Sequence, residues 1–223
     1  MTTLNPADKK SFNVVLSNGN LTVTGNDAGG NNWVRSTTPT TLKRYVEFTI
    51  NTVSNTIVGI ADASAITYPG GNDKSFGLFA NSAGSIAGTF PNWNVTYTTG
   101  DVLGLAIDLT AKLIWWRKNG GPWNNGGTDD PATGVGGFDI SLYTGTVHHL
   151  IASGDIGLVS TVNFGATAFA AAAPAGFSPW DIPPTGRCKV WSGSAWGLKP
   201  VKWWNGSAWI TKPMKVWNGT GWV

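Results

Sequence analysis

Residues 100–120, GDVLGLAIDLTAKLIWWRKNG, carry the clearest structural signal in the chain. They hold two runs rich in β-branched and aromatic residues, at 102–108 and 112–118, and the pair Asn119-Gly120 follows the second run. Apolar runs of this length, bounded by Gly, Asn or Asp, are typical of β-strands. An Asn-Gly pair supplies the positive φ angles that a tight turn needs. The segment therefore predicts two β-strands with antiparallel neighbours.

Strand-like runs of the same kind recur along the chain. They occupy residues 13–16, 21–24, 44–50, 56–61, 75–80, 149–153 and 159–163, and the turn SNGN at 17–20 separates the first two. No segment has a helical period over twelve or more residues, since the best candidate, 169–174, is a short alanine run that Pro174 stops. Many short strands without alternating helices predict an all-β antiparallel sandwich of two packed sheets.

The composition limits the classes of protein that the chain can belong to. Its 223 residues, 41% of them hydrophobic, suffice for one well-filled core, and only 12% are charged. Cys188 is the single cysteine, so an internal disulfide is excluded. Residues 1–10 are polar and no stretch of about 18 apolar residues occurs. We therefore expect synthesis in the cytoplasm, with no signal peptide and no membrane insertion.

The composition of the sequence changes after Trp180. Residues 181–187, DIPPTGR, are expected to form an extended linker because paired prolines stiffen the chain. Residues 188–223 contain three copies of a 13-residue repeat, KVWSGSAW at 189–196, KWWNGSAW at 202–209 and KVWNGTGW at 215–222. The sequence thus predicts a sandwich at 1–180, a Pro-rich linker at 181–187 and a Trp-rich repeat region at 188–223.

Each repeat places two tryptophans on either side of a glycine turn, which predicts one small β-hairpin. A unit of 13 residues cannot bury its own apolar face, so it must pack on other repeats, on the sandwich or on another protein. The predicted assembly interface consists of Trp191, Trp196, Trp204, Trp209, Trp217 and Trp222.

The charges of the chain are divided unevenly. Residues 187–223 hold six basic and no acidic side chains, whereas residues 1–186 hold the other nine basic and all 12 acidic ones. Because the six basic side chains are dispersed, they favour an acidic protein partner over nucleic acid.

Motifs for catalysis or for a metal ion are missing from the sequence. Asp101 and Asp108 are interpreted as carboxylates that hold a turn and a strand end by accepting backbone N–H groups. His148 and His149 are adjacent in a predicted strand and point to opposite faces, so they cannot share one ion. No His or Asn lies at a spacing that would indicate a nucleophilic role for Cys188. We predict no catalytic residue, no metal site and no cofactor.

Two kinds of tryptophan site stand out in the body. Trp115 and Trp116 lie in one predicted strand, so one ring should face the core and the other the opposite face of the sheet. Trp93 and Trp123 lie in segments rich in Gly and Asn, which predicts exposed loop tryptophans suited to binding.

The order of motifs from residue 21 to residue 180 resembles the SPRY family. The segments that carry the resemblance are VRST at 34–37, RYVEFTI at 44–50, VGIA at 58–61, SFGL at 75–78, GDVLG at 100–104, AIDL at 106–109, IWWRKNG at 114–120, VNFG at 162–165 and PAGF at 174–177. The opening LNPADK at 4–9 looks like the start of phage and prophage SPRY proteins, and the Trp-Asn-Gly-Ser-Ala-Trp repeats look like the ends of phage virion proteins.

The resemblance implies a bent, concanavalin-like antiparallel β-sandwich that binds a partner through loops at one edge. The corresponding segments are 63–74, 81–97 and 122–138, and the candidate ligand contacts in them are Tyr68, Trp93, Trp123, Asn124 and Asn125. Aromatic rings with amide groups suit either a protein or a sugar.

The function expected from these patterns is that of a bacteriophage virion structural protein, on a tail fibre, a baseplate or a capsid surface. Its partners would be other virion proteins or its own copies, and a host glycan or protein, with no nucleic acid. The alternative is a carbohydrate-binding protein for host recognition. A third possibility, a glycan hydrolase, needs two carboxylates in a cleft. Because Glu47 is the one glutamate of the chain, the sequence does not favour this function.

Overall fold

The computed structural model describes residues 1–28, 32–40, 42–65, 68–181, 187–191, 193, 196–200 and 202–211. It divides the chain into two compact units, Met1–Asp181 and Ile182–Val223. Most of the predicted linker at 181–187 and the whole third repeat, with Trp217 and Trp222, lie outside the described residues. No helix in the described ranges is long and apolar enough to cross a membrane.

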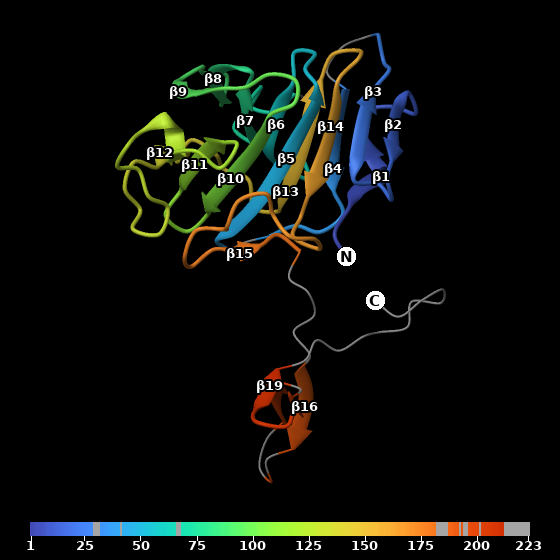
Figure 1. Cartoon of the computed structure of the whole chain (residues 1–223). Coiled ribbons are helices and arrows are strands. Elements are labelled where there is room, and N and C mark those ends of the chain that lie inside the picture. The colour runs from blue at the N-terminus through green and yellow to red at the C-terminus, as the bar shows by residue number, and fades with distance from the viewer. Residues whose placement is uncertain are drawn as a thin grey trace. The chain divides into compact units, whose positions relative to one another are not determined.

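Two antiparallel sheets build the first unit (Figure 1). The first sheet has the strand order β1-β4-β13-β6-β7-β8-β9. Its strands are β1 (Leu4–Lys9), β4 (Asn32–Ser36), β6 (Ile57–Asp62), β7 (Ser75–Phe79), β8 (Asn81–Ile86), β9 (Asn92–Thr96) and β13 (His148–Gly154).

The second sheet has the strand order β12-β11-β10-β5-β14-β3-β2. Its strands are β2 (Val14–Ser17), β3 (Thr22–Gly25), β5 (Arg44–Thr52), β10 (Val102–Asp108), β11 (Leu113–Lys118), β12 (Phe138–Asp139) and β14 (Val159–Asn163). A short strand, β15 (Ser178–Pro179), runs parallel to the start of β5. The all-β antiparallel sandwich that the sequence predicts is confirmed.

Side chains from both sheets fill the space between them. On β5, the alternate residues Val46, Phe48 and Ile50 belong to this core, whereas Tyr45 points to the other face of the sheet, as the two-residue period of a strand requires. Trp115 and Trp116 divide in the same way, since Trp116 packs in the core between the sheets and Trp115 packs with Tyr45 on the outer face. Both indoles are buried, and the predicted split is confirmed.

All nine strand-like runs of the sequence form strands, with ends that differ by at most two residues. Strands β1, β4, β8, β9, β12 and β15 were not among the predicted runs. Residues 169–174 form no helix, and the described part of the chain has a single 3₁₀ turn, η1 (Trp123–Asn125). The two predicted turns have the expected geometry, with positive φ at Asn18, Gly19 and Asn20 and at Asn119 and Gly120.

The first two repeats of the tail form hairpins, as predicted. Strands β16 (Arg187–Trp191) and β17 (Trp196–Pro200) pair so that Trp191 lies opposite Trp196. Strands β18 (Lys202–Trp204) and β19 (Trp209–Thr211) pair so that Trp204 lies opposite Trp209. In the second hairpin, Asn205 Oδ1 accepts the backbone N–H groups of Ser207 and Ala208, which explains why asparagine opens the turn.

Candidate functional site

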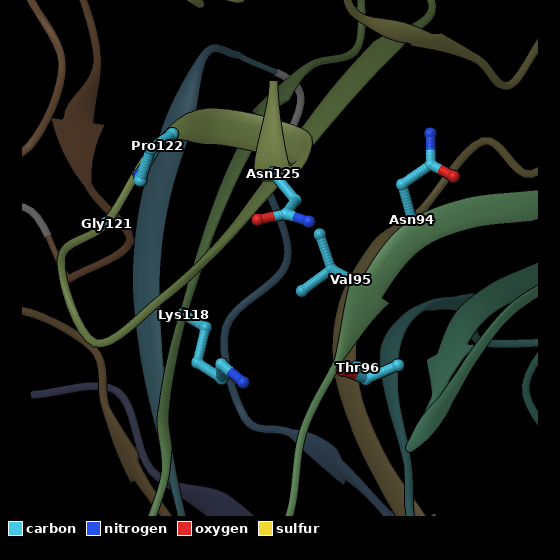
Figure 2. A pocket seen from close by; sticks show the side chains of 7 residues that line it. All are labelled: Asn94, Val95, Thr96, Lys118, Gly121, Pro122 and Asn125. Carbon is cyan, nitrogen blue, oxygen red and sulfur yellow. The ribbon is translucent and has the colours of Figure 1, made fainter. Parts of the chain in front are cut away.

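A pocket of about 220 Å³ opens between β9 and the segment that contains η1. Its lining residues are Asn94, Val95, Thr96, Lys118, Gly121, Pro122 and Asn125. Figure 2 shows Lys118 and Asn125 pointing toward Val95 and Thr96 across the pocket. The pocket thus combines amide groups, a hydroxyl, one ammonium and small apolar surfaces.

The wall that β9 provides follows from the alternating sequence NWNVTY at residues 92–97. Trp93, Val95 and Tyr97 are buried in the core, while Asn94 and Thr96 are exposed on the other side of the strand. The Trp93 ring stacks on Phe138 with 5.8 Å between centroids. The buried half of the strand thus holds the exposed half in a fixed position.

The opposite wall depends on a buried asparagine. Asn124 is 3% exposed, and its Oδ1 accepts the backbone N–H of Trp116 at 2.9 Å. Its Nδ2 donates to the carbonyl oxygen of Gly136 at 2.6 Å. These two bonds fix η1 against β11, so the next residue, Asn125, presents its exposed side chain to the pocket.

Trp123 stands beside the pocket and packs on a buried cation. The Arg117 guanidinium lies 4.4 Å from the Trp123 ring centroid and 5.0 Å from that of Tyr45. Arg117 Nη2 donates to the hydroxyl oxygen of Tyr45 and to the carbonyl oxygen of Ala172. Burial raises the pKa of Tyr45 well above its usual range, so its hydroxyl stays protonated and donates to Glu47 Oε1.

The structure distributes the five predicted contact residues over different environments. Asn125 lines the pocket, and Trp123 is half-buried next to it. Both polar atoms of the Asn124 side chain have partners inside the fold, so we do not assign a ligand contact to it. Tyr68 is half-buried in the segment before β7, where its carbonyl oxygen accepts the backbone N–H of Gly71.

The expectation of an exposed loop tryptophan at Trp93 is wrong. Trp93 belongs to strand β9 and is 2% exposed. An ideal Cβ on Gly84 would lie 2.3 Å from two atoms of the Trp93 ring, so the absence of a side chain at Gly84 makes room for the indole. The pocket residues that the sequence does not predict as contacts are Asn94, Val95, Thr96, Lys118, Gly121 and Pro122. The alternation NWNVTY is the signal for the first three.

The tail carries the other predicted interface. Trp204 and Trp209 are 49% and 65% exposed, and their ring centroids lie 5.7 Å apart. The side chains of Trp191 and Trp196 lie outside what the structure describes. The second hairpin therefore presents two neighbouring indoles that its own strands leave uncovered.

The carboxylates that could suggest catalysis are occupied by partners within the fold. Glu47 is 3% exposed and accepts from the Tyr45 hydroxyl and from the backbone N–H groups of Ala170 and Ala171. Asp101 accepts the backbone N–H of Thr98, and Asp108 accepts those of Thr110 and Ala111, so the interpretation of both as turn and strand-end residues is confirmed.

A metal site is equally unsupported by the side chains that can be placed. His149 Nδ1 lies 2.7 Å from the carbonyl oxygen of Ser36, and the side chain of His148 lies outside the described part. Among the described residues, no group of three or more His, Cys, Asp or Glu side chains could hold a metal ion.

Comparison with solved structures agrees with this architecture, although no protein-family model matches the chain. The SPRY domain of human HERC1 superposes with a TM-score of 0.57 at 15% identity, over 74% of this chain and 99% of that chain. The TRIM65 PSpry domain gives 0.53 at 13% identity, over 73% and 91%. Stonustoxin gives 0.54 at 15% identity, over 73% of this chain and 27% of that chain. The chain therefore has a SPRY-like fold.

Proposed function

We propose that this chain is a structural protein of a bacteriophage virion, in which the SPRY-like body displays a binding site and the Trp repeats anchor or oligomerise the protein. The observation that carries the anchoring role is the pair of exposed, adjacent indoles of Trp204 and Trp209. The repeats and the opening segment, which resemble phage proteins, support the virion role. The body acts by binding and has no catalytic role.

Anchoring follows from the small size of the hairpin. Two strands of three residues each cannot form a core of their own, and an isolated hairpin of this kind is marginally stable. Burying the exposed part of each indole against another surface contributes about 1–2 kcal/mol. Several repeats acting together would hold the chain firmly on a neighbouring subunit or on a second copy.

Light scattering on the full chain tests the anchor. We expect the wild-type protein to form oligomers in a concentration-dependent manner and the double variant Trp204→Ser/Trp209→Ser to shift toward the monomer. Lys202→Ser is the matched control, because it removes an exposed charge from the same hairpin and leaves both indoles in place. A wild-type protein that stays monomeric, or a control that dissociates equally, argues against self-association through the indoles.

Quantitative mass spectrometry of purified particles tests the virion role directly. We expect particles released from the producing bacterium to contain the chain in a fixed ratio to the major capsid or tail protein. Recovery of the chain only in the soluble lysate, with none in density-purified particles, contradicts the proposal.

A second candidate is a carbohydrate-binding protein for host recognition. The amide-lined pocket with Asn94 and Asn125 favours it, because amides form hydrogen bonds with sugar hydroxyls, and exposed indoles stack on sugar rings. Acrylamide quenching of tryptophan fluorescence in assembled particles separates the candidates. Shielded tail tryptophans support the anchor, whereas accessible ones, with glycan-array binding lost in Trp209→Ala, support sugar recognition by the tail.

A further inference from the structure

A second pocket, of about 290 Å³, lies at the end of the sandwich where β5 begins. Its lining residues are Pro39, Thr40, Arg44, Thr146 and Val147. Arg44 and Thr40 are each 6% exposed. Among the described residues that line this pocket, the buried Arg44 is therefore the single charged side chain.

The strand geometry directs Arg44 toward the space between the sheets. Arg44 lies on the same face of β5 as Val46 and Phe48, which both belong to the core between the sheets. Thr146 and Val147 approach from the segment before β13 of the other sheet, and Asp62 Oδ2 fixes them by accepting their backbone N–H groups at 2.7 and 2.8 Å. The pocket thus lies at the end of the core, between Arg44 of one sheet and the fixed residues Thr146 and Val147 beside the other.

Arg44 has few hydrogen bonds for a buried cation. Of the five N–H donors of its guanidinium, one on Nη1 donates to the backbone carbonyl of Lys43 at 3.1 Å. Its Nε is buried and has no hydrogen-bond partner. No ion pair joins Arg44 to a carboxylate among the described residues, and burial lowers its pKa. The nearby Lys43 is itself neutralised by Asp108 at 2.9 Å.

Arg35 shows what a satisfied buried arginine looks like in the same molecule. Its Nε and Nη2 donate to the two carboxylate oxygens of Asp8 at 2.8 and 2.6 Å. Its Nη1 donates to the carbonyl oxygens of Asp62 and Ala65. Both arginines are 6% exposed, yet only Arg35 has a counter-ion within the fold. A buried charge without a counter-ion is costly. The pocket beside Arg44 has room for the anion that would pair with it.

We propose that the Arg44 pocket binds the carboxylate of a polypeptide partner, from an acidic side chain or a C-terminus. One guanidinium with apolar contacts from Pro39 and Val147 matches a singly charged group on a short carbon chain. A phosphate group carries about two negative charges, whereas Arg44 is the single cation among the described lining residues. The proposal is independent of the virion role.

Arginine Nε–H resonances of the full-length wild-type protein provide the test. We expect acetate to shift the Arg44 signal saturably, while the Arg35 signal, already paired with Asp8, stays in place. The peptides Ac-Gly-Gly-OH and Ac-Asp-NH₂ separate a terminal from a side-chain carboxylate, and a saturable Arg44 shift with either supports the proposal. Ac-Gly-Gly-NH₂ is the matched control without a carboxylate. Arg44→Gln, if it folds by circular dichroism, should lose carboxylate binding at least tenfold.

Three results would overturn the proposal. The first is the absence of a saturable Arg44 shift with acetate and with both carboxylate peptides. The second is an equal shift with sodium chloride at matched ionic strength, which indicates screening instead of a site. The third is tighter binding of inorganic phosphate than of any carboxylate. Because the titrations use the wild-type chain, these outcomes do not depend on whether the variant folds.

Discussion

Asn124 replaces a strand at the edge of the second sheet, because its side-chain Oδ1 accepts the backbone N–H of Trp116 at 2.9 Å. Strand β12 pairs with β11 only at Leu113 and Ile114. A buried N–H further along β11 therefore has no neighbouring backbone to bond, and the amide of Asn124 supplies the acceptor. The same side chain connects β11 to Gly136, so one asparagine holds the wall of the first pocket together.

Asn124→Ala should lower the free energy of unfolding by about 2–3 kcal/mol, because it leaves a buried N–H unpaired. Urea denaturation followed by tryptophan fluorescence measures the loss. Asn125→Ala is the matched control, since both asparagines have positive φ, 48° and 56°, but Asn125 is exposed. Equal losses in the two variants would mean that backbone strain, and not the hydrogen bonds of Asn124, causes the effect.

The sequence predicts the strands that are rich in β-branched and aromatic residues, because their local pattern agrees with their final burial. The sequence does not predict β8, because the residues NSAGSI are small and polar and their place in the sheet is set by β7 and β9. For β9 the asparagines favour turns, although the sequence has the two-residue period of a strand.

Neither pocket can be read from local sequence. The first brings residues 94–96 against residues 118–125, and the second brings Arg44 of one sheet against Thr146 and Val147 of the segment before β13 in the other. These contacts are products of sheet packing. The alternation RYVEFTI does place Arg44 on the core side of β5, but the missing counter-ion becomes visible only when all its neighbours are known.

Gly84→Ala should destabilise the protein by about 1–3 kcal/mol, because the new methyl group overlaps the Trp93 ring. The ring would leave its stack on Phe138, so the near-ultraviolet circular dichroism should change as well. Gly127→Ala is the control, with no atom within 4 Å of the added carbon, and its effect should stay within about 0.5 kcal/mol. An unchanged spectrum in Gly84→Ala would show that the packing of Trp93 does not depend on this glycine.

Glu47→Gln should lower the free energy of unfolding by about 2–4 kcal/mol, since an amide nitrogen would face donors that now point to a carboxylate. Three donors converge on Glu47: the Tyr45 hydroxyl and the backbone N–H groups of Ala170 and Ala171. Tyr45→Phe is the companion variant, because it removes one of these donors and also the hydroxyl that accepts from Arg117 Nη2. Thermal unfolding by circular dichroism compares the variants, and a Glu47→Gln protein as stable as the wild type would refute a structural role of the carboxylate.

Asp62 should make the stability of the protein depend on pH in the acid range. Burial favours the neutral acid, but hydrogen bonds from Ser64, Val147 and Thr146 outweigh it and hold the pKa of Asp62 well below its ordinary value of 3.8. Because the native pKa is depressed, this stabilisation is complete above pH 3.8 and is lost as the pH falls from there toward the native pKa.

Asp62→Asn should therefore be about 2–3 kcal/mol less stable than the wild type at pH 7, and the difference should shrink below about pH 4. Urea denaturation at a series of pH values measures both curves. Asp139→Asn, at an exposed carboxylate, is the control for the loss of one negative charge and should stay within about 0.5 kcal/mol at pH 7. A difference between Asp62→Asn and the wild type that stays constant down to pH 3 would contradict the depressed pKa, because protonation of the wild-type carboxylate would then cost nothing.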